Sequence, residues 1–182
     1  MRGVSGLISI AVLLCSVAVA ADEPHLWAAA ELGYGEVALD LDRPTGGSGG
    51  RFSTAFKLGA VVHPTFRGGL MLGGWLLDSG DVNDPSRGAG VGQAFLVAQV
   101  HPVRRREIFV LLGGGYLSYW DNAPGASGCH GWGATAGMGW EFAVSQHLAV
   151  YPVLSYDRGD LGGTLPDRSM NAWTLRAGIA RR

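Results

Sequence analysis

The chain has 182 residues, 14 basic and 15 acidic side chains, and a formal net charge of −1. This balance argues against a nucleic-acid-binding surface, which needs a basic excess. The apolar content of 47% argues against intrinsic disorder. The 30 glycines disfavour a helical bundle, because each glycine inside a helix costs about 1 kcal/mol relative to alanine.

The first twenty residues have the pattern of a secretory signal peptide. Arg2 supplies a positive charge, an apolar stretch runs from Leu7 to Val17, and Ala18-Val19-Ala20 supplies a small-x-small cleavage site. We therefore expect a cleaved signal peptide over residues 1–20 and a mature domain over residues 21–182. The apolar stretch is shorter than the roughly 20 residues of a spanning helix, although a retained anchor is the alternative.

The remaining chain alternates between apolar and small or polar side chains, which is the period of a β-strand. Segments of this kind are separated by clusters of Gly, Pro, Asp, Asn and Ser. In the fourth and fifth segments both faces are apolar, and Gln93 and Gln99 indicate which face of the fourth points inward. We expect eight strands, at residues 25–38, 51–63, 65–77, 89–101, 107–120, 131–144, 148–157 and 169–180.

The connections between these segments alternate strictly in length. The short ones are His63-Pro64, Pro102 to Arg106 and Ser145 to His147, and the long, turn-rich ones are residues 39–50, 78–88, 121–130 and 158–168. An even number of antiparallel strands with short turns at one end and longer loops at the other is typical of an outer-membrane barrel. The segments also reach the roughly 9–11 residues that a tilted spanning strand needs.

Aromatic residues gather near the two ends of the predicted strands. Two aromatic belts are expected where a barrel meets the two membrane interfaces. Near the long loops we expect Tyr34, Phe52, Trp75, Trp120, Trp132, Tyr156 and Trp173, and near the short turns Trp27, Phe66, Phe109, Trp140, Phe142 and Tyr151.

With these features the whole mature chain resembles the small eight-stranded outer-membrane barrels of the OmpA transmembrane-domain and OmpX type. The resemblance implies an all-β fold: a closed, antiparallel, up-and-down transmembrane β-barrel in a bacterial outer membrane, with both termini in the periplasm. It also implies outer-membrane lipids as partners. The chain departs from the family pattern at its end, Gly178-Ile179-Ala180-Arg181-Arg182, where such chains commonly carry an aromatic residue.

Turning the apolar strand faces toward lipid places six charged residues inside the barrel. A basic side chain at the lipid midplane would cost about 2–4 kcal/mol, which favours this orientation. An eight-stranded barrel is just wide enough for its own side chains, so we expect a closed, salt-bridged interior. The alternative is a narrow gated pore in which pairs such as Glu141 with Arg176 exchange partners. The six residues are Glu31, Lys57, Arg67, Glu141, Asp157 and Arg176.

Metal chemistry is not expected, and neither is a cofactor. His63, His101 and His147 lie near the short turns on separate hairpins, too far apart to supply the three or four ligands of a zinc site. We interpret them as hydrated turn residues. Cys129 is the single cysteine after cleavage, so it forms no disulfide within the mature chain, and with His130 it offers too few ligands for a site.

Catalytic residues would have to lie near the outer rim, where Asp121, Ser127, His130 and Asp157 are the candidates. Nucleophilic catalysis needs a base within hydrogen-bond reach and a third group that orients it, and no motif brings these residues together. Arg158-Gly159-Asp160 spells a tripeptide read by some adhesion receptors, but it is also ordinary turn chemistry, which we favour.

We therefore expect a non-enzymatic outer-membrane protein that supports membrane integrity or binds a surface partner through its four external loops. Nucleic acid is not an expected partner. One alternative is a lipid-modifying outer-membrane enzyme. Another is a secreted, lipocalin-like carrier, which would keep its apolar face inside the barrel.

Overall fold

The computed structural model describes residues 26–40, 49–78, 88–102, 107–122, 128–162 and 168–181. The predicted signal peptide over residues 1–20 lies outside these ranges. No helix long and apolar enough to cross a membrane occurs in the described ranges. Their strands are β1 (Leu26–Asp40), β2 (Gly49–His63), β3 (Phe66–Asp78), β4 (Ala89–Val100), β5 (Ile108–Asp121), β6 (Cys129–Trp140), β7 (Phe142–Ala143), β8 (Leu148–Asp160) and β9 (Ser169–Arg181).

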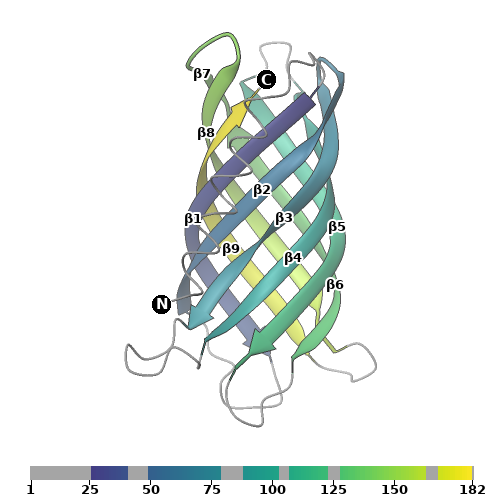
Figure 1. Cartoon of the computed structure of the whole chain (residues 1–182), viewed down its shortest axis with the longest axis vertical. Helices are drawn as coiled ribbons and strands as arrows, with labels where there is room; N and C mark the ends of the chain where they lie inside the picture. Colours follow the sequence, from purple (N-terminus) through teal and green to yellow (C-terminus); the bar gives the residue numbers. More distant parts are fainter. Residues whose placement is uncertain are drawn as a thin grey trace.

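The strands form one closed antiparallel sheet, as Figure 1 shows. Strands β1 to β6 each pair with the next along the chain, β8 pairs with β9, and β1 closes the ring by pairing with both β2 and β9. The short β7 continues β6 beyond Glu141, and both pair with β8. The predicted eight-stranded, up-and-down barrel is therefore confirmed, with the sixth strand interrupted at Glu141. The short-turn end carries β7 and the chain's C-terminus at the top of Figure 1.

The strands are strongly tilted around the barrel. A row of paired residues that leaves β1 at Asp40 passes through Ser169, Asp160 and Trp132 and returns to β1 at Ala30. The row has thus shifted by ten residues in one circuit. For eight strands, this stagger corresponds to a tilt of about 40° from the barrel axis.

Alternation of side chains along each strand separates an apolar outer surface from a mixed interior. Leucines and aromatic residues are exposed on the outside of every part of the wall, for example Leu32, Leu72, Leu96 and Leu154. On β4, the inward face carries Val91, Gln93, Phe95, Val97 and Gln99, all buried. The orientation that Gln93 and Gln99 indicate for this strand is confirmed.

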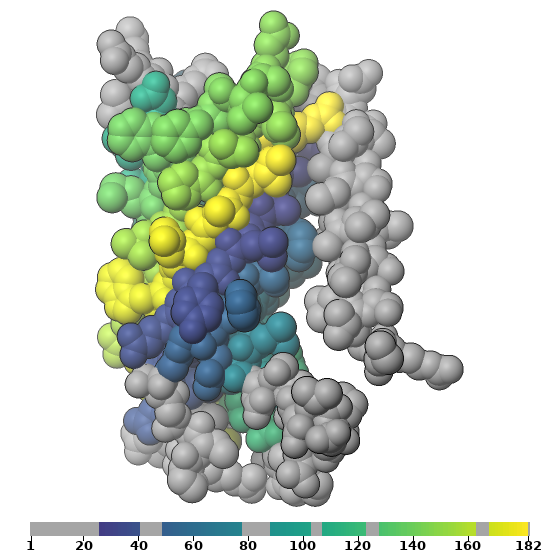
Figure 2. Space-filling model, turned by 90° about the vertical axis from the view of Figure 1, so that its left-hand side faces the viewer, coloured from purple at the N-terminus to yellow at the C-terminus, as the bar shows by residue number. Residues whose placement is uncertain are grey.

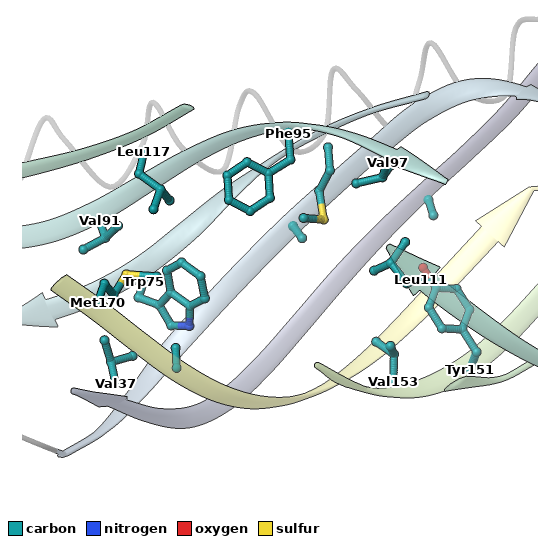
Figure 3. Packing of buried hydrophobic residues seen from close by; sticks show 14 of the residues in the cluster. Val37, Trp75, Val91, Phe95, Val97, Leu111, Leu117, Tyr151, Val153 and Met170 are labelled. Atoms are coloured by element: carbon teal, nitrogen blue, oxygen red, sulfur yellow. The ribbon is translucent and has the colours of Figure 1, made fainter. Parts of the chain in front are cut away.

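Glycines on β5 and β6 make room inside the barrel for large side chains. A Cβ atom on Gly133 would lie 2.5 Å from Leu117 Cδ1, and one on Gly139 would lie 2.3 Å from Phe109 Cζ. Gly133 and Gly139 lie an even number of residues from the buried Thr135, so they share its inward face. Figure 3 shows the apolar side chains that fill the lumen, with Trp75, Val91 and Met170 in one group and Leu111, Val153 and Tyr151 in another.

Two strands extend further toward the long loops than predicted. β1 extends to Asp40 and β8 extends to Asp160, so Arg158-Gly159-Asp160 lies within a strand. The interpretation of this tripeptide as a turn is wrong. Its residues continue the alternation of β8, with Arg158 and Asp160 exposed and Gly159 buried, and they are held by pairing with both neighbouring strands.

Replacing Gly139 by alanine tests the tight packing of the lumen. The new Cβ would overlap Phe109, so we expect the free energy of unfolding to fall by about 1–3 kcal/mol in urea titrations of the refolded protein. Adding Phe109→Leu should recover part of that loss by withdrawing the ring. Gly68→Ala is the matched control, because its Cβ would meet Phe66 Cε1 only at 3.5 Å. Equal losses for the two alanines would contradict this packing.

Candidate functional site

The candidate site is the polar interior of the barrel. All six charged residues that were expected inside are buried there. They come from six different stretches of chain, and the closure of the sheet brings them together. Three are acidic and three are basic, so the buried formal charge is balanced. Balance is needed, because an unpaired charge in a low-dielectric interior is strongly destabilising.

Glu31 on β1 is the centre of the middle cluster. Its Oε1 accepts hydrogen bonds from Lys57 Nζ on β2 and, at 2.7 Å, from the hydroxyl of Tyr151 on β8. Its Oε2 lies 3.9 Å from Nη1 of Arg176 on β9. The Lys57 ammonium also lies 5.7 Å from the centre of the Tyr151 ring. One carboxylate therefore ties together three other strands across the lumen.

Arg176 extends this cluster toward the long-loop end. Its Nη1 donates to Ser155 Oγ at 3.0 Å, and its Nη2 donates to Asp157 Oδ2 at 3.4 Å. Its guanidinium lies 5.7 Å from the centre of the Trp75 ring, close enough for a cation–π interaction. Trp75 is held in turn by a 3.1 Å hydrogen bond from its indole nitrogen to Thr174 Oγ1.

A second cluster fills the lumen at the short-turn end. Arg67 on β3 forms a bidentate pair with Glu141, at 2.5 and 3.2 Å. Gln99 donates to the same carboxylate at 2.9 Å, and His101 Nε2 lies 3.7 Å from it. Bidentate guanidinium–carboxylate pairs are strong and directional. Glu141 sits at the break between β6 and β7, so the interruption of the sixth strand coincides with this cluster.

Two tryptophans lie where the belt prediction did not put them. Trp27 is 0% exposed and Trp75 is 1% exposed, so both are inside the barrel and not on its outer surface. Phe109 and Tyr151 are buried as well. All four residues lie close enough to the strand ends for a belt. Whether such a residue faces lipid or the lumen depends, however, on the alternation of side chains along its strand. Trp27 shares the inward face with Glu31, and Trp75 shares it with Arg67. The other belt residues lie outside; Tyr34, Trp120, Trp132, Trp140 and Trp173 are exposed, and Tyr156 packs on Trp173 at 4.7 Å.

The pairing inside the lumen also differs from the example named for a gated pore. Glu141 pairs with Arg67, whereas Arg176 pairs with Asp157 and approaches Glu31. The stagger of the strands places Glu141 and Arg176 in different clusters. Sequence alone indicates which face a residue occupies, but the partner depends on the stagger.

The catalytic candidates that lie within the described residues are not assembled into a site. Asp157 is buried inside the barrel with Arg176, whereas His130 is exposed on the outer face and stacks on Tyr116 at 5.9 Å. These two residues therefore lie on opposite sides of the barrel wall. Asp121 accepts a 3.3 Å hydrogen bond from the Tyr119 hydroxyl. Ser127 lies outside the described residues.

The three histidines near the short turns occupy different environments. His63 and His147 are exposed, as expected for turn residues. His101 is buried beside Glu141 and Phe109, so its interpretation as a hydrated turn residue is wrong. In the described part of the chain, no three His, Cys, Asp or Glu residues gather as metal ligands would. Cys129 is a half-buried free thiol on β6.

His101, Tyr151 and Thr174 also belong to the polar interior, although none of the three was predicted there. The spacing along the strands indicated the position of the last two. Tyr151 lies an even number of residues from Asp157, and Thr174 lies two residues from Arg176, so each shares a strand face with a buried charged residue. Following the parity of the charged residues along each strand would have placed both inside. His101 had the same signal through Gln99, two residues before it.

The barrel is similar in fold to solved bacterial outer-membrane proteins. Neisserial surface protein A aligns over 86% of this chain and 96% of its own, with a TM-score of 0.56 and 16% identity. OprG from Pseudomonas aeruginosa aligns over 86% of this chain and 94% of its own, with a TM-score of 0.53 and 11% identity. No family model and no curated protein matches the sequence. At these identities the likeness establishes the fold, that of the small outer-membrane β-barrels.

Removing one partner of the Glu31–Lys57 pair tests the buried network. Glu31→Gln leaves the Lys57 ammonium buried without its carboxylate, so we expect a loss of about 3–5 kcal/mol in the free energy of unfolding. The double variant Glu31→Gln with Lys57→Met removes both charges and should be more stable than Glu31→Gln alone. Urea titrations measure both values. A double variant that is no more stable than Glu31→Gln alone would show that the two charges are not coupled and would contradict the pairing described here.

Proposed function

We propose that the protein is a bacterial outer-membrane barrel with a closed lumen, and that it acts as a rigid, non-enzymatic membrane anchor for its four long loops. The observation that carries this proposal is the buried, charge-balanced network that crosses the lumen. It joins side chains of β1, β2, β8 and β9 in the middle of the barrel and of β3 and β4 with Glu141 near the short turns.

The outer surface supports a location within a bilayer. Its exposed large side chains are aliphatic between two zones that carry exposed aromatic residues, such as Trp132 and Trp173 toward the long loops and Trp140 and Phe142 toward the short turns. An apolar band flanked by aromatic girdles matches the profile of a bilayer. A closed sheet also satisfies every strand's hydrogen bonds without water, which a bilayer requires. A lipocalin-like carrier would need the opposite arrangement, with the apolar face inside.

Large side chains that fill the lumen argue against a permanent pore. Trp27, Trp75, Phe95 and Arg176 are among the largest fully buried side chains, and all point into a barrel of only eight strands. Opening a path would require breaking buried ion pairs, whose charges would then be left without partners. We therefore expect interaction with other molecules to occur through the four long connecting segments.

An arginine scan of the outer face tests the membrane location. Leu72 lies in the middle of β3 and is 46% exposed, whereas Val62 lies next to the end of β2 and is 70% exposed. In lipid vesicles we expect Leu72→Arg to cost about 2–4 kcal/mol of unfolding free energy and Val62→Arg about 0–1 kcal/mol. In a water-soluble protein both substitutions would be tolerated. Similar small effects at both positions would therefore contradict a lipid-facing surface.

Conductance measurements test the closed lumen. We expect the purified protein to give no stepwise current in planar lipid bilayers, because paired side chains fill the barrel. The variant Arg176→Ser with Asp157→Ser is the matched comparison, since it removes bulk and keeps the buried charge balanced. We expect it to conduct more than the unaltered protein. Steady current steps from the unaltered protein would show an open pore and overturn the proposed closure.

A further inference from the structure

A shallow groove of about 600 Å³ lies on the outer face of the barrel, where β1, β8 and β9 run side by side. Figure 2 views the barrel from a side on which β9 runs diagonally between β8 and β1. Glu31, Tyr151 and Gly178 also line it but belong to the inward-facing positions of their strands, whereas the eight outward-facing lining residues are all apolar. They come from five strands, so the groove crosses the sheet and does not follow one strand.

The groove follows one row of paired residues. Phe56 on β2 pairs with Ala30 on β1, which pairs with Ile179 on β9; Ile179 pairs with Val150 on β8, and Val150 pairs with Phe142 on β7. All five line the groove. Four strand spacings of about 4.8 Å give the row a length of about 19 Å.

A second row shapes the groove. Leu32, Ala177 and Pro152 lie in the next outward row and also line it. The small side chains of Ala30 and Ala177 lower the surface at the β1–β9 seam, while the exposed Leu32, Ile179 and Phe142 stand above it. A depression with large apolar walls and a small-residue floor suits a slender, flexible hydrocarbon.

The direction of the groove matches one leaflet of a bilayer. At a strand tilt of about 40°, the row moves away from the short-turn end by about 3 Å per strand, or roughly 12 Å from Phe142 to Phe56. That is about half of the roughly 25 Å apolar band of a barrel. The end of the groove at Phe142 lies at the short-turn rim, where Trp140 and Phe142 stack in parallel with ring centres 5.9 Å apart. The groove thus begins at one interface and ends near the bilayer midplane.

We propose that this groove is a binding site for one acyl chain of a phospholipid in the leaflet on the short-turn side. Its length and lining fit a single chain that enters beside the Trp140–Phe142 stack and ends near Phe56. A second copy of the protein fits less well, because a recess needs a protruding ridge as its partner, whereas a flexible chain adapts to it. This inference rests on the proposed membrane location.

Photo-crosslinking tests the site with the full protein in phosphatidylethanolamine vesicles. The probe is a phosphatidylethanolamine with a diazirine in the middle of one sixteen-carbon chain, and labelled residues are identified by mass spectrometry. We expect labelling at Ala30, Ala177 and Ile179 to exceed labelling at Leu70 and Met138, on other parts of the outer face, by at least fivefold. Ala177→Phe fills the groove and should reduce the excess to the level of those reference positions.

Ala136→Phe is the matched control, because Ala136 is an exposed alanine on the outer face of β6, away from the groove. It should leave the labelling pattern unchanged. Equal labelling around the whole barrel would overturn the groove while leaving the membrane location intact. Protein-to-protein crosslinks through the groove would overturn it in favour of a second copy. Absence of labelling everywhere would instead contradict the membrane location itself.

Discussion

The structure depends on the closure of the sheet between β1 and β9. Thirteen residues of β1, from Ala28 to Asp40, pair with β9, so neither terminal strand is left with an open edge. A bilayer offers no water to satisfy unpaired backbone groups, and closure is the way in which a sheet meets that condition. Closure of an even number of antiparallel strands also places the start of β1 and the end of β9 at the same end of the barrel, and it defines an interior that the side chains must fill.

The polar interior is a consequence of that closure. Eight strands leave a lumen that side chains can fill, and this chain fills it with aromatic rings opposite glycines and with two ion-paired clusters. Glu31 and Glu141 each collect several donors, so the buried charges are neutralised locally. The filled lumen and the apolar exterior both result from the alternation of side chains between the two faces of each strand.

Much of the fold could be predicted from the sequence, because a period of two and alternating connection lengths are both local signals. The charged residues identified the inward face for the same reason. Trp27 and Trp75 were misplaced because height along a strand is compatible with either face, and only parity separates them. The partner of each charge could not be predicted. Glu141 meets Arg67, 74 residues away, through a stagger of ten residues that no local pattern encodes. Arg158 was wrongly predicted to lie in a turn, because Arg-Gly-Asp is a common turn sequence. Pairing with β6 and β9 instead continues β8 through this residue.

A single gel tests the closed membrane barrel most directly. The outer-membrane fraction of expressing bacteria is run in detergent with and without boiling, and the protein is detected by immunoblot. A closed barrel resists unfolding in detergent until it is heated, so we predict a band in this fraction whose mobility changes on boiling. A protein found in the soluble periplasmic fraction, with the same mobility before and after heating, would contradict the account.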